Sequence, residues 1–202
     1  EFVVAGSLWV RGYEVRDGRQ RWSSRGLARV SNASPVAGDG LLIVSSWNVG
    51  GDEGDRVTMV PFDEVSAAND ASKDGLLVLD EFPKSPIRDR FSQIDVDKDG
   101  RVTRGEYEHM RDMFAKADNR IFAIKPNGYG DISDSHVTWQ VSKHLPYVSS
   151  PLAYDGRVYA FKNGGLASCY ETRSGRQHYQ AERLDAPGDY YIRNDDRSTA
   201  SI

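Results

Sequence analysis

The part of the sequence best suited to chemistry is an acidic loop, DVDKDGRVTRGE, which runs from Asp95 to Glu106. It has carboxylates at its first, third, fifth and twelfth positions and a glycine, Gly100, at its sixth. Calcium is a hard cation that takes about six to eight oxygen ligands, so its sites need several oxygens that converge on one point. Without a cation, the four carboxylates would repel one another. Gly100 permits the sharp bend that would turn the chain around an ion.

This spacing is typical of an EF-hand calcium loop. The predicted ligands are the side chains of Asp95, Asp97, Asp99 and Glu106 and the main-chain carbonyl of Arg101. The alternative is a solvated acidic turn without a metal. That alternative requires the carboxylate spacing, the glycine and the aliphatic Val102 at the eighth position to coincide by chance. We therefore expect this loop to bind calcium.

A second and weaker loop, DASKDGLLVLDE, lies upstream. Its predicted ligands are the side chains of Asp70, Ser72, Asp74 and Glu81 and the carbonyl of Leu76. Serine replaces a carboxylate at the third position, and Val78 offers no side-chain oxygen at the ninth. On its own the stretch fits an ordinary Asp/Ser/Gly turn, but beside the downstream loop it is better explained as the second half of a pair. Leu77 and Val102 hold the same loop position, which forms a short strand bridge in paired EF-hands. Two calcium sites are therefore expected.

Apolar residues recur at helical spacing on the flanks of both loops, so helices are expected there. Before the downstream loop, Ser85 followed by Pro86 predicts an N-cap with proline at the first helical position. With an apolar face on each helix, the pair can bury a small core of its own. The apolar residues concerned are Phe62, Val65, Ile87, Phe91, Ile94, Tyr107, Met110, Phe114 and Ala117.

The composition excludes several classes of function. The 202-residue chain carries a net charge of −4, with its acids concentrated around the two loops, which leaves no nucleic-acid footprint. No apolar run approaches the length needed to span a membrane. The single cysteine, Cys169, excludes an internal disulfide and is expected to be a small buried residue within a strand. The chain begins at Glu1 with neither methionine nor a signal peptide, so we expect a processed or truncated polypeptide.

An internal repeat predicts the rest of the architecture. The segment YEVRDGRQRW at Tyr13–Trp22 matches YETRSGRQHY at Tyr170–Tyr179 in six of ten positions. The segment SPVAGDGLLIV at Ser34–Val44 matches SPLAYDGRVYA at Ser150–Ala160 in five of eleven. The spacing of these segments gives a unit of about 41 residues, which fits one four-stranded blade of a β-propeller. Strand-forming residues beside Asp-Gly turns support the same conclusion.

The acidic loops interrupt this repeat. After the strand that starts at Leu41, the glycines Gly50, Gly51 and Gly54 open an excursion that returns near Arg120. Residues 121–124 resume the blade, and Asn127-Gly128 is expected to make its next turn. We therefore expect propeller residues at 1–49, an inserted EF-hand pair at 50–119 and further propeller residues at 120–202. Extra length in a surface connection has little effect on stability.

The repeat, SPxxxDG with a strand and then a G-x-x-x-W turn, resembles the pyrroloquinoline-quinone-type (PQQ-like) β-propeller repeat. The resemblance covers about Phe2 to Tyr191, beyond which the opening of another blade is missing. That family includes quinoprotein dehydrogenases and outer-membrane assembly scaffold propellers, and its combination with an EF-hand insert resembles secreted bacterial proteins. The resemblance implies that Trp22 and Trp139, and Tyr179 in the last repeat, pack between neighbouring blades.

The resemblance implies a mainly β fold: a partial propeller of about three four-stranded blades with an inserted all-α EF-hand pair. It also implies a periplasmic or secreted bacterial location. A closed propeller needs at least about four blades, and three would leave strand edges exposed. We therefore expect that the chain is a fragment, or that further propeller blades or a protein partner complete the ring.

Three functions are compatible with these features. The first and preferred one is a non-enzymatic, calcium-stabilised scaffold or interaction protein, because the sequence lacks a nucleophile–base constellation and any Walker, Rossmann or GxSxG motif. The second is a PQQ-dependent oxidoreductase. Those enzymes carry adjacent cysteines over the cofactor, whereas this chain has only Cys169, so we expect neither bound PQQ nor catalytic residues here. The third is a calcium sensor that opens an apolar groove, for which only Met110 and Met113 would supply a flexible methionine surface.

Overall fold

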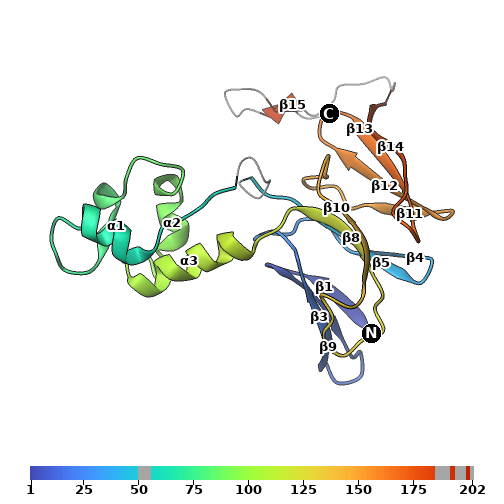
Figure 1. Cartoon of the computed structure of the whole chain (residues 1–202), viewed down its shortest axis with the longest axis horizontal. Coiled ribbons are helices and arrows are strands. Elements are labelled where there is room, and N and C mark those ends of the chain that lie inside the picture. The colour runs from blue at the N-terminus through green and yellow to red at the C-terminus, as the bar shows by residue number, and fades with distance from the viewer. Residues whose placement is uncertain (50–55, 185–191, 194–198, 201–202) are drawn as a thin grey trace. The chain divides into compact units, whose positions relative to one another are not determined.

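The computed structural model describes residues 1–49, 56–184, 192–193 and 199–200 (Figure 1). The chain divides into two compact units, one formed by Glu1–Asp52 and Asp118–Ile202 and the other by Glu53–Ala117. The first unit carries several antiparallel sheets, and the chain is mainly β, as predicted. The second unit contains all of the helices described. The glycines expected to open the excursion (Gly50, Gly51 and Gly54) lie outside the described residues.

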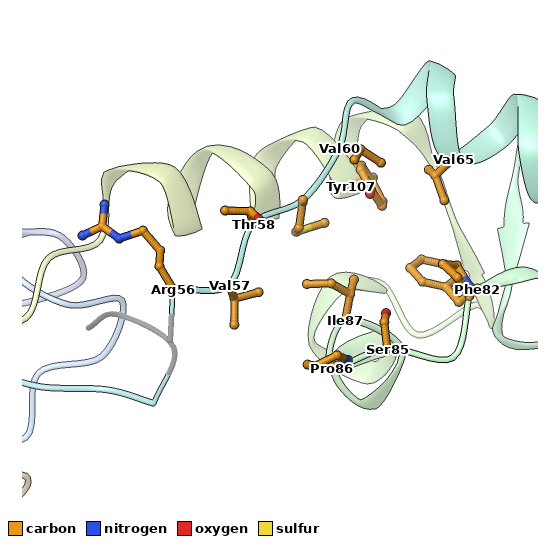
Figure 2. Close-up of a pocket in the computed structure, with 12 residues that line it drawn as sticks. Arg56, Val57, Thr58, Val60, Val65, Phe82, Ser85, Pro86, Ile87 and Tyr107 are labelled. Carbon is orange, nitrogen blue, oxygen red and sulfur yellow. The ribbon is translucent and has the colours of Figure 1, made fainter. Parts of the chain in front are cut away.

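The helical unit consists of short elements around the two acidic loops. Its elements are α1 (Phe62–Asn69), β6 (Leu77–Val78), the 3₁₀ turns η1 (Leu79–Glu81) and η2 (Arg88–Arg90), α2 (Phe91–Ile94), β7 (Arg101–Val102) and α3 (Arg104–Lys116). The apolar residues on its helices point into one core, as their spacing predicts. The buried members of that core are Met59, Phe62, Val65, Leu77, Phe82, Ile94, Val102, Tyr107, Met110 and Phe114. A cavity of about 450 Å³ lies beside this core (Figure 2).

The α-helix predicted to start at Pro86 starts later and is shorter than expected. Ser85 and Pro86 lie in a turn, the 3₁₀ turn η2 follows, and only Phe91–Ile94 is α-helical. The guanidinium groups of Arg88 and Arg90 donate to the carbonyls of Phe82 and Pro86, at 3.1 and 2.6 Å. The carbonyl of Pro86 thus accepts from the side chain of Arg90, whereas an α-helix would have used the backbone N–H of Arg90, which donates to Ile87 instead.

The helix after the upstream loop is equally short, and a proline explains its end. The 3₁₀ turn η1 covers the last three residues of the loop and is not continued, because Phe82 is extended, with φ −76° and ψ 134°. Pro83 disfavours the helical conformation in the residue before it and has no N–H of its own to donate. The downstream loop, in contrast, runs directly into the 13-residue helix α3.

The β unit is built from short strands. They are β1 (Phe2–Ala5), β2 (Trp9–Tyr13), β3 (Gln20–Arg25), β4 (Val36–Gly38), β5 (Leu41–Ser46), β8 (Arg120–Ile124), β9 (Gly130–Asp131), β10 (Val137–Val141), β11 (Leu152–Tyr154), β12 (Arg157–Lys162), β13 (Leu166–Glu171), β14 (Gln177–Arg183), β15 (Ile192–Arg193) and β16 (Thr199–Ala200). Over the described residues of this unit, they form three four-stranded sheets and the pair β15–β16. The first sheet has the order β1-β2-β3-β9, the second β10-β8-β5-β4 and the third β11-β12-β13-β14.

The second sheet joins strands from both sides of the helical unit in the sequence. Residues 121–124 resume the sheet as predicted, because β8 pairs antiparallel with β5 and places Phe122 opposite Val44. All six residues of β5 are buried. Because side chains alternate between the two faces of a strand, a fully buried strand must have neighbours on both faces.

Two apolar clusters cover these two faces. The cluster between the first and second sheets includes Val10, Trp22, Leu42, Val44, Phe122 and Ile124. The cluster between the second and third sheets includes Leu41, Ile43, Ile121, Ala123, Trp139, Val158 and Ala160. The three sheets are therefore stacked face to face, with the second sheet in the middle.

The sequence repeat is also a repeat of strand register. In each sheet, the aromatic residue at the end of the repeat lies opposite a small residue on the neighbouring strand. The three pairs are Trp22 with Gly12, Trp139 with Ala123 and Tyr179 with Cys169. A Cβ atom at Gly12 would lie 2.3 Å from the Trp22 ring, which explains why this position is small. Cys169 is buried in β13, as predicted.

Trp139 also connects two sheets directly. Its indole N–H donates to the carbonyl of Thr172, which follows β13, at 2.7 Å. A Cβ atom at Gly175 would lie 2.6 Å from the Trp139 side chain, so the glycine makes room for the aromatic ring. The packing role predicted for this tryptophan is confirmed for the second and third sheets.

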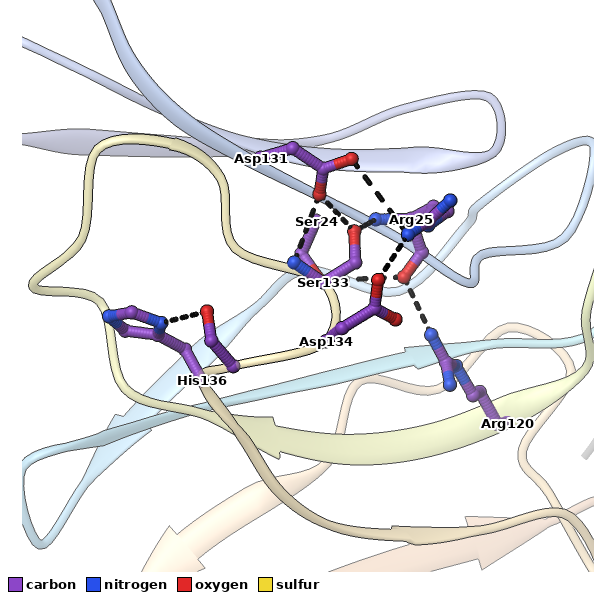
Figure 3. A network of polar contacts seen from close by, with 8 residues as sticks. Ser24, Arg25, Arg120, Asp131, Ser133, Asp134 and His136 are labelled. Carbon is purple, nitrogen blue, oxygen red and sulfur yellow. Dashed lines mark hydrogen bonds and ion pairs between the residues drawn. The ribbon is translucent and has the colours of Figure 1, made fainter.

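The turn predicted at Asn127-Gly128 is wrong. Residues 125–136 form a loop between β8 and β10, and within it β9 joins the first sheet in parallel beside β3. Polar contacts hold this loop in place (Figure 3): the backbone N–H of Arg25 donates to Ser133 Oγ at 2.9 Å, and its guanidinium to Asp134 at 2.6 Å. Hydrogen bonds from the hydroxyl and N–H of Ser133 hold the pKa of Asp131 below its ordinary value. The loop thereby ties the first sheet to the second.

Candidate metal centre

Three of the predicted ligands in the downstream loop lie close together. One carboxylate oxygen from each of Asp95, Asp97 and Asp99 lies within 4.8 Å of the other two. Lys98 and Gly100 have φ values of 64° and 85°, and these left-handed residues curl the chain around the three carboxylates. The loop thus concentrates negative charge on one point, as a divalent cation requires.

Asp95 is the decisive residue of this cluster, because it is 5% exposed. Its Oδ2 accepts a hydrogen bond from the N–H of Gly100 at 3.1 Å. Its Oδ1 is buried and has no hydrogen-bond partner among the described residues. A buried carboxylate oxygen without a donor is strongly unfavourable unless a cation or a donor compensates its charge. This oxygen is therefore available as a ligand for a cation at the cluster.

Glu106 closes the downstream loop. Its Oε1 accepts from the N–H of Val96 at 2.8 Å, and its Oε2 accepts from the N–H and the hydroxyl of Thr103, at 2.9 and 2.8 Å. Desolvation alone would raise the pKa of Glu106, but the hydrogen bonds from Thr103 and Val96 hold the pKa below its ordinary value. The carboxylate that would bind calcium at the twelfth position is thus kept ionised.

Thr103 has a second role that the sequence analysis missed. It is the N-cap of α3 and forms a capping box with Glu106, so the end of the loop and the start of the helix share one set of hydrogen bonds. The T-x-x-E spacing from Thr103 to Glu106 was the available signal. Arg101, whose carbonyl is the remaining predicted ligand, lies in β7.

The upstream loop repeats this hydrogen-bond scheme. Its Glu81 accepts from the N–H groups at the second and ninth positions, Ala71 at 3.0 Å and Val78 at 3.1 Å. The N–H of Gly75 donates to Asp70 Oδ2 at 3.0 Å, as that of Gly100 does to Asp95. The two loops therefore have the same backbone arrangement at equivalent positions.

A short antiparallel bridge joins the loops. Leu77 in β6 lies opposite Val102 in β7, as predicted from their shared loop position, and neither side chain is exposed. The bridge anchors both loops in the core of the helical unit.

The first carboxylates of the two loops differ. Both oxygens of Asp70 accept hydrogen bonds within the loop, Oδ1 from the Ser72 hydroxyl at 3.1 Å and from the N–H of Lys73 at 2.7 Å. Desolvation opposes the effect, but the hydrogen bonds from Gly75, Ser72 and Lys73 lower the pKa of Asp70. Within residues 70–81, which are all described, no three carboxylates converge as they do in the downstream loop. Ser72, Asp74 and Leu76 therefore belong to the weaker candidate.

Comparison with known proteins found no matching family model and no matching curated protein. Among the described residues, no helix is both long enough and apolar enough to cross a membrane.

Proposed function

We propose that this protein is a calcium-binding, non-enzymatic β-propeller scaffold or interaction protein. Calcium stabilises an EF-hand pair that is inserted into one of its blades. The observation that carries the calcium assignment is the buried Oδ1 of Asp95, which has no hydrogen-bond partner in the described residues and belongs to a cluster with Asp97 and Asp99. Oxygen-only ligands in a loop of this spacing favour calcium over softer metals.

In this proposal, bound calcium stabilises the folded state of the helical unit. Folding brings seven carboxylates and one serine oxygen to two points, and bound calcium offsets their mutual repulsion. A ligand that binds only the folded state stabilises it by about 2.7 kcal/mol at 100 times its dissociation constant. In the periplasmic or secreted bacterial location that the family resemblance implies, sites with dissociation constants of about 10⁻⁴ to 10⁻³ M would stay filled.

The propeller assignment is a separate part of the proposal. It is supported by three observations on the β unit: the face-to-face stacking of three sheets, the burial of the middle sheet on both faces, and the repeated pairing of an aromatic residue with a small one. In this interpretation the three sheets are successive blades of a PQQ-like propeller, and further blades or a protein partner complete the ring.

A calorimetric calcium titration of the chelator-treated protein tests the metal site. We expect the wild-type chain to bind calcium and Asp95→Asn to lose most of the affinity of the downstream loop. The matched control is Asp112→Asn, which removes an exposed carboxylate of α3 that pairs with Lys116 on the same helix. Equal affinities for wild type and Asp95→Asn would refute the assignment.

A further inference from the structure

The segment that precedes α1 has the alternation of a bound extended peptide. Met59 is buried and Val57 is half-buried, whereas Arg56, Thr58 and Val60 are exposed. The segment has neither helical nor strand hydrogen bonding. Alternate burial in an extended segment means that one face lies on an apolar surface. That surface is the core of the helical unit, because Met59 belongs to its cluster and Val57 packs against it.

Two side chains of α3 hold the backbone of this segment. Arg111 Nε donates to the carbonyl of Met59 at 3.1 Å, and the N–H of Phe62 donates to Glu108 Oε1 at 2.7 Å. Arg111 and Glu108 also pair with each other at 2.8 Å, one turn apart on the helix. Both contacts are to main-chain groups, one in the extended segment and one at the first residue of α1, so they hold the chain whatever its side chains are.

The cavity beside the core gives the groove its outline (Figure 2). Residues 56–60 form one wall, and the turn with Ser85, Pro86 and Ile87 forms another. Phe82 and Tyr107 lie at one end of the cavity. The segment therefore lies along an apolar depression and fills only part of it.

We propose that the helical unit has a peptide-binding groove and that its resident ligand is its own segment Val57–Val60. Met59 is the anchor side chain, Arg111 holds the carbonyl of Met59, and Glu108 holds the N–H of Phe62 three residues later. With the segment in place, the part of the groove that Met59 fills is closed to other apolar partners. The occupancy of the groove by residues 57–60 does not depend on the proposed calcium sites. The inference that the segment stays bound when calcium binds rests on the proposed function.

The consequence is a unit that binds calcium without exposing an apolar groove. Sensor proteins expose such a groove when calcium binds, and a target helix then occupies it. Here α3 begins at the proposed calcium loop and carries both anchors, so a fixed α3 keeps the segment bound. The tethered segment has an effective concentration on the order of millimolar, and a competitor must exceed that.

The test compares Met59→Asp with Val60→Asp in the full chain. The first variant places a charge in the groove, and the second places the same charge on the adjacent side chain, which is 51% exposed. We expect an apolar dye to show little calcium-dependent fluorescence with wild type and Val60→Asp, and a severalfold increase with Met59→Asp. A synthetic peptide of residues 56–62 at millimolar concentration should suppress that increase, and the same peptide with aspartate in place of methionine should not. Equal dye binding by the two variants, or an increase that the peptide leaves unchanged, overturns the proposal.

A second variant covers the case in which Met59→Asp loses its helical circular dichroism. Arg111→Ala removes one backbone anchor and leaves the core residues in place, and Lys116→Ala, an exposed residue of the same helix, is its control. We expect calcium-dependent dye fluorescence to increase severalfold in Arg111→Ala only, and equal fluorescence in Arg111→Ala and Lys116→Ala overturns the proposal. Calorimetry on the same samples reports calcium binding separately, so failure of the groove and failure of the calcium sites are distinguishable.

Discussion

The two acidic loops of the helical unit share one backbone design but differ in the environment of their first carboxylate. In both, the twelfth-position glutamate accepts from the same two N–H positions, and the sixth-position glycine donates to the first aspartate. Asp95 is buried with an oxygen that lacks a hydrogen-bond partner among the described residues, whereas both oxygens of Asp70 accept hydrogen bonds from their own loop.

The difference shows how one side chain changes the electrostatics of a fixed backbone. A carboxylate at the third position, Asp97, adds charge to the downstream cluster. At the same position upstream, Ser72 donates its hydroxyl to Asp70 and satisfies it. The downstream cluster therefore leaves a carboxylate oxygen available for a cation, while the donors of the upstream loop already satisfy its first carboxylate. We expect the downstream loop to bind calcium more tightly.

The largest effect is expected from breaking the bridge that joins the loops. Leu77→Ala should destabilise the helical unit by about 2–5 kcal/mol, because Leu77 is fully buried and its truncation leaves a cavity. Urea denaturation followed by far-UV circular dichroism measures this. Val78→Ala, on the same strand but with a side chain that is 39% exposed, is the control and should change stability by less than about 0.5 kcal/mol. If both variants lose the same stability, Leu77 and the bridge do not anchor the loops.

The next largest effect is expected from replacing the glutamate at the twelfth position of each loop. Glu106→Gln should weaken the tighter calcium-binding event by about 100-fold, which is the upper end of the effect found for residues that only orient a metal ligand. Glu81→Gln should leave that event almost unchanged and weaken only the second one. Isothermal titration of calcium into both variants and wild type distinguishes the events. A larger loss in Glu81→Gln would reverse the ranking of the loops.

Much of this arrangement follows from local sequence. The loops are predictable because their ligands and hydrogen bonds lie within twelve consecutive residues, so spacing alone defines their geometry. The register of the sheets is predictable for a related reason: a repeat that places Trp22 and Trp139 at the same position is expected to place a small residue opposite each of them.

What the sequence did not predict depends on contacts between distant segments. Arg111 binds the carbonyl of Met59 from 52 positions away, so no local pattern identifies residues 57–60 as part of the helical core. The turn at Asn127-Gly128 was wrong because β9 pairs with β3, more than a hundred residues earlier in the chain. The α-helix after Pro86 starts later than predicted, and there the side chain of Arg90 binds the Pro86 carbonyl that an α-helix would pair with a backbone N–H. The burial of Asp95, which gives the metal site its strongest support, is also a property of the folded unit.

A substitution that is expected to strengthen calcium binding has a smaller effect, but it tests the comparison of the two loops directly. Ser72→Asp restores a carboxylate at the third position of the upstream loop and removes the hydroxyl that now donates to Asp70. Calcium affinity of EF-hand loops follows the number of charged ligands, so we expect the weaker binding event to tighten on the order of tenfold. A two-site calorimetric titration checks this, with Lys73→Ala as a control that leaves all predicted ligands in place. No change in Ser72→Asp would mean that the third position is not a ligand of this loop.

The smallest effect concerns the ninth position, where Thr103 caps α3 and Val78 has no side-chain oxygen. Thr103→Ala removes the N-cap hydroxyl, which accepts from the N–H of Glu106 and donates to the Glu106 carboxylate, so the helical unit should lose about 1 kcal/mol. Thr103→Ser keeps the hydroxyl and should restore most of that stability. Urea denaturation with and without calcium gives a further distinction, since a role confined to capping lowers stability equally in both conditions. A loss that appears only with calcium would instead mean that Thr103 acts through the metal site, and the loops would then differ at two ligand positions, the third and the ninth.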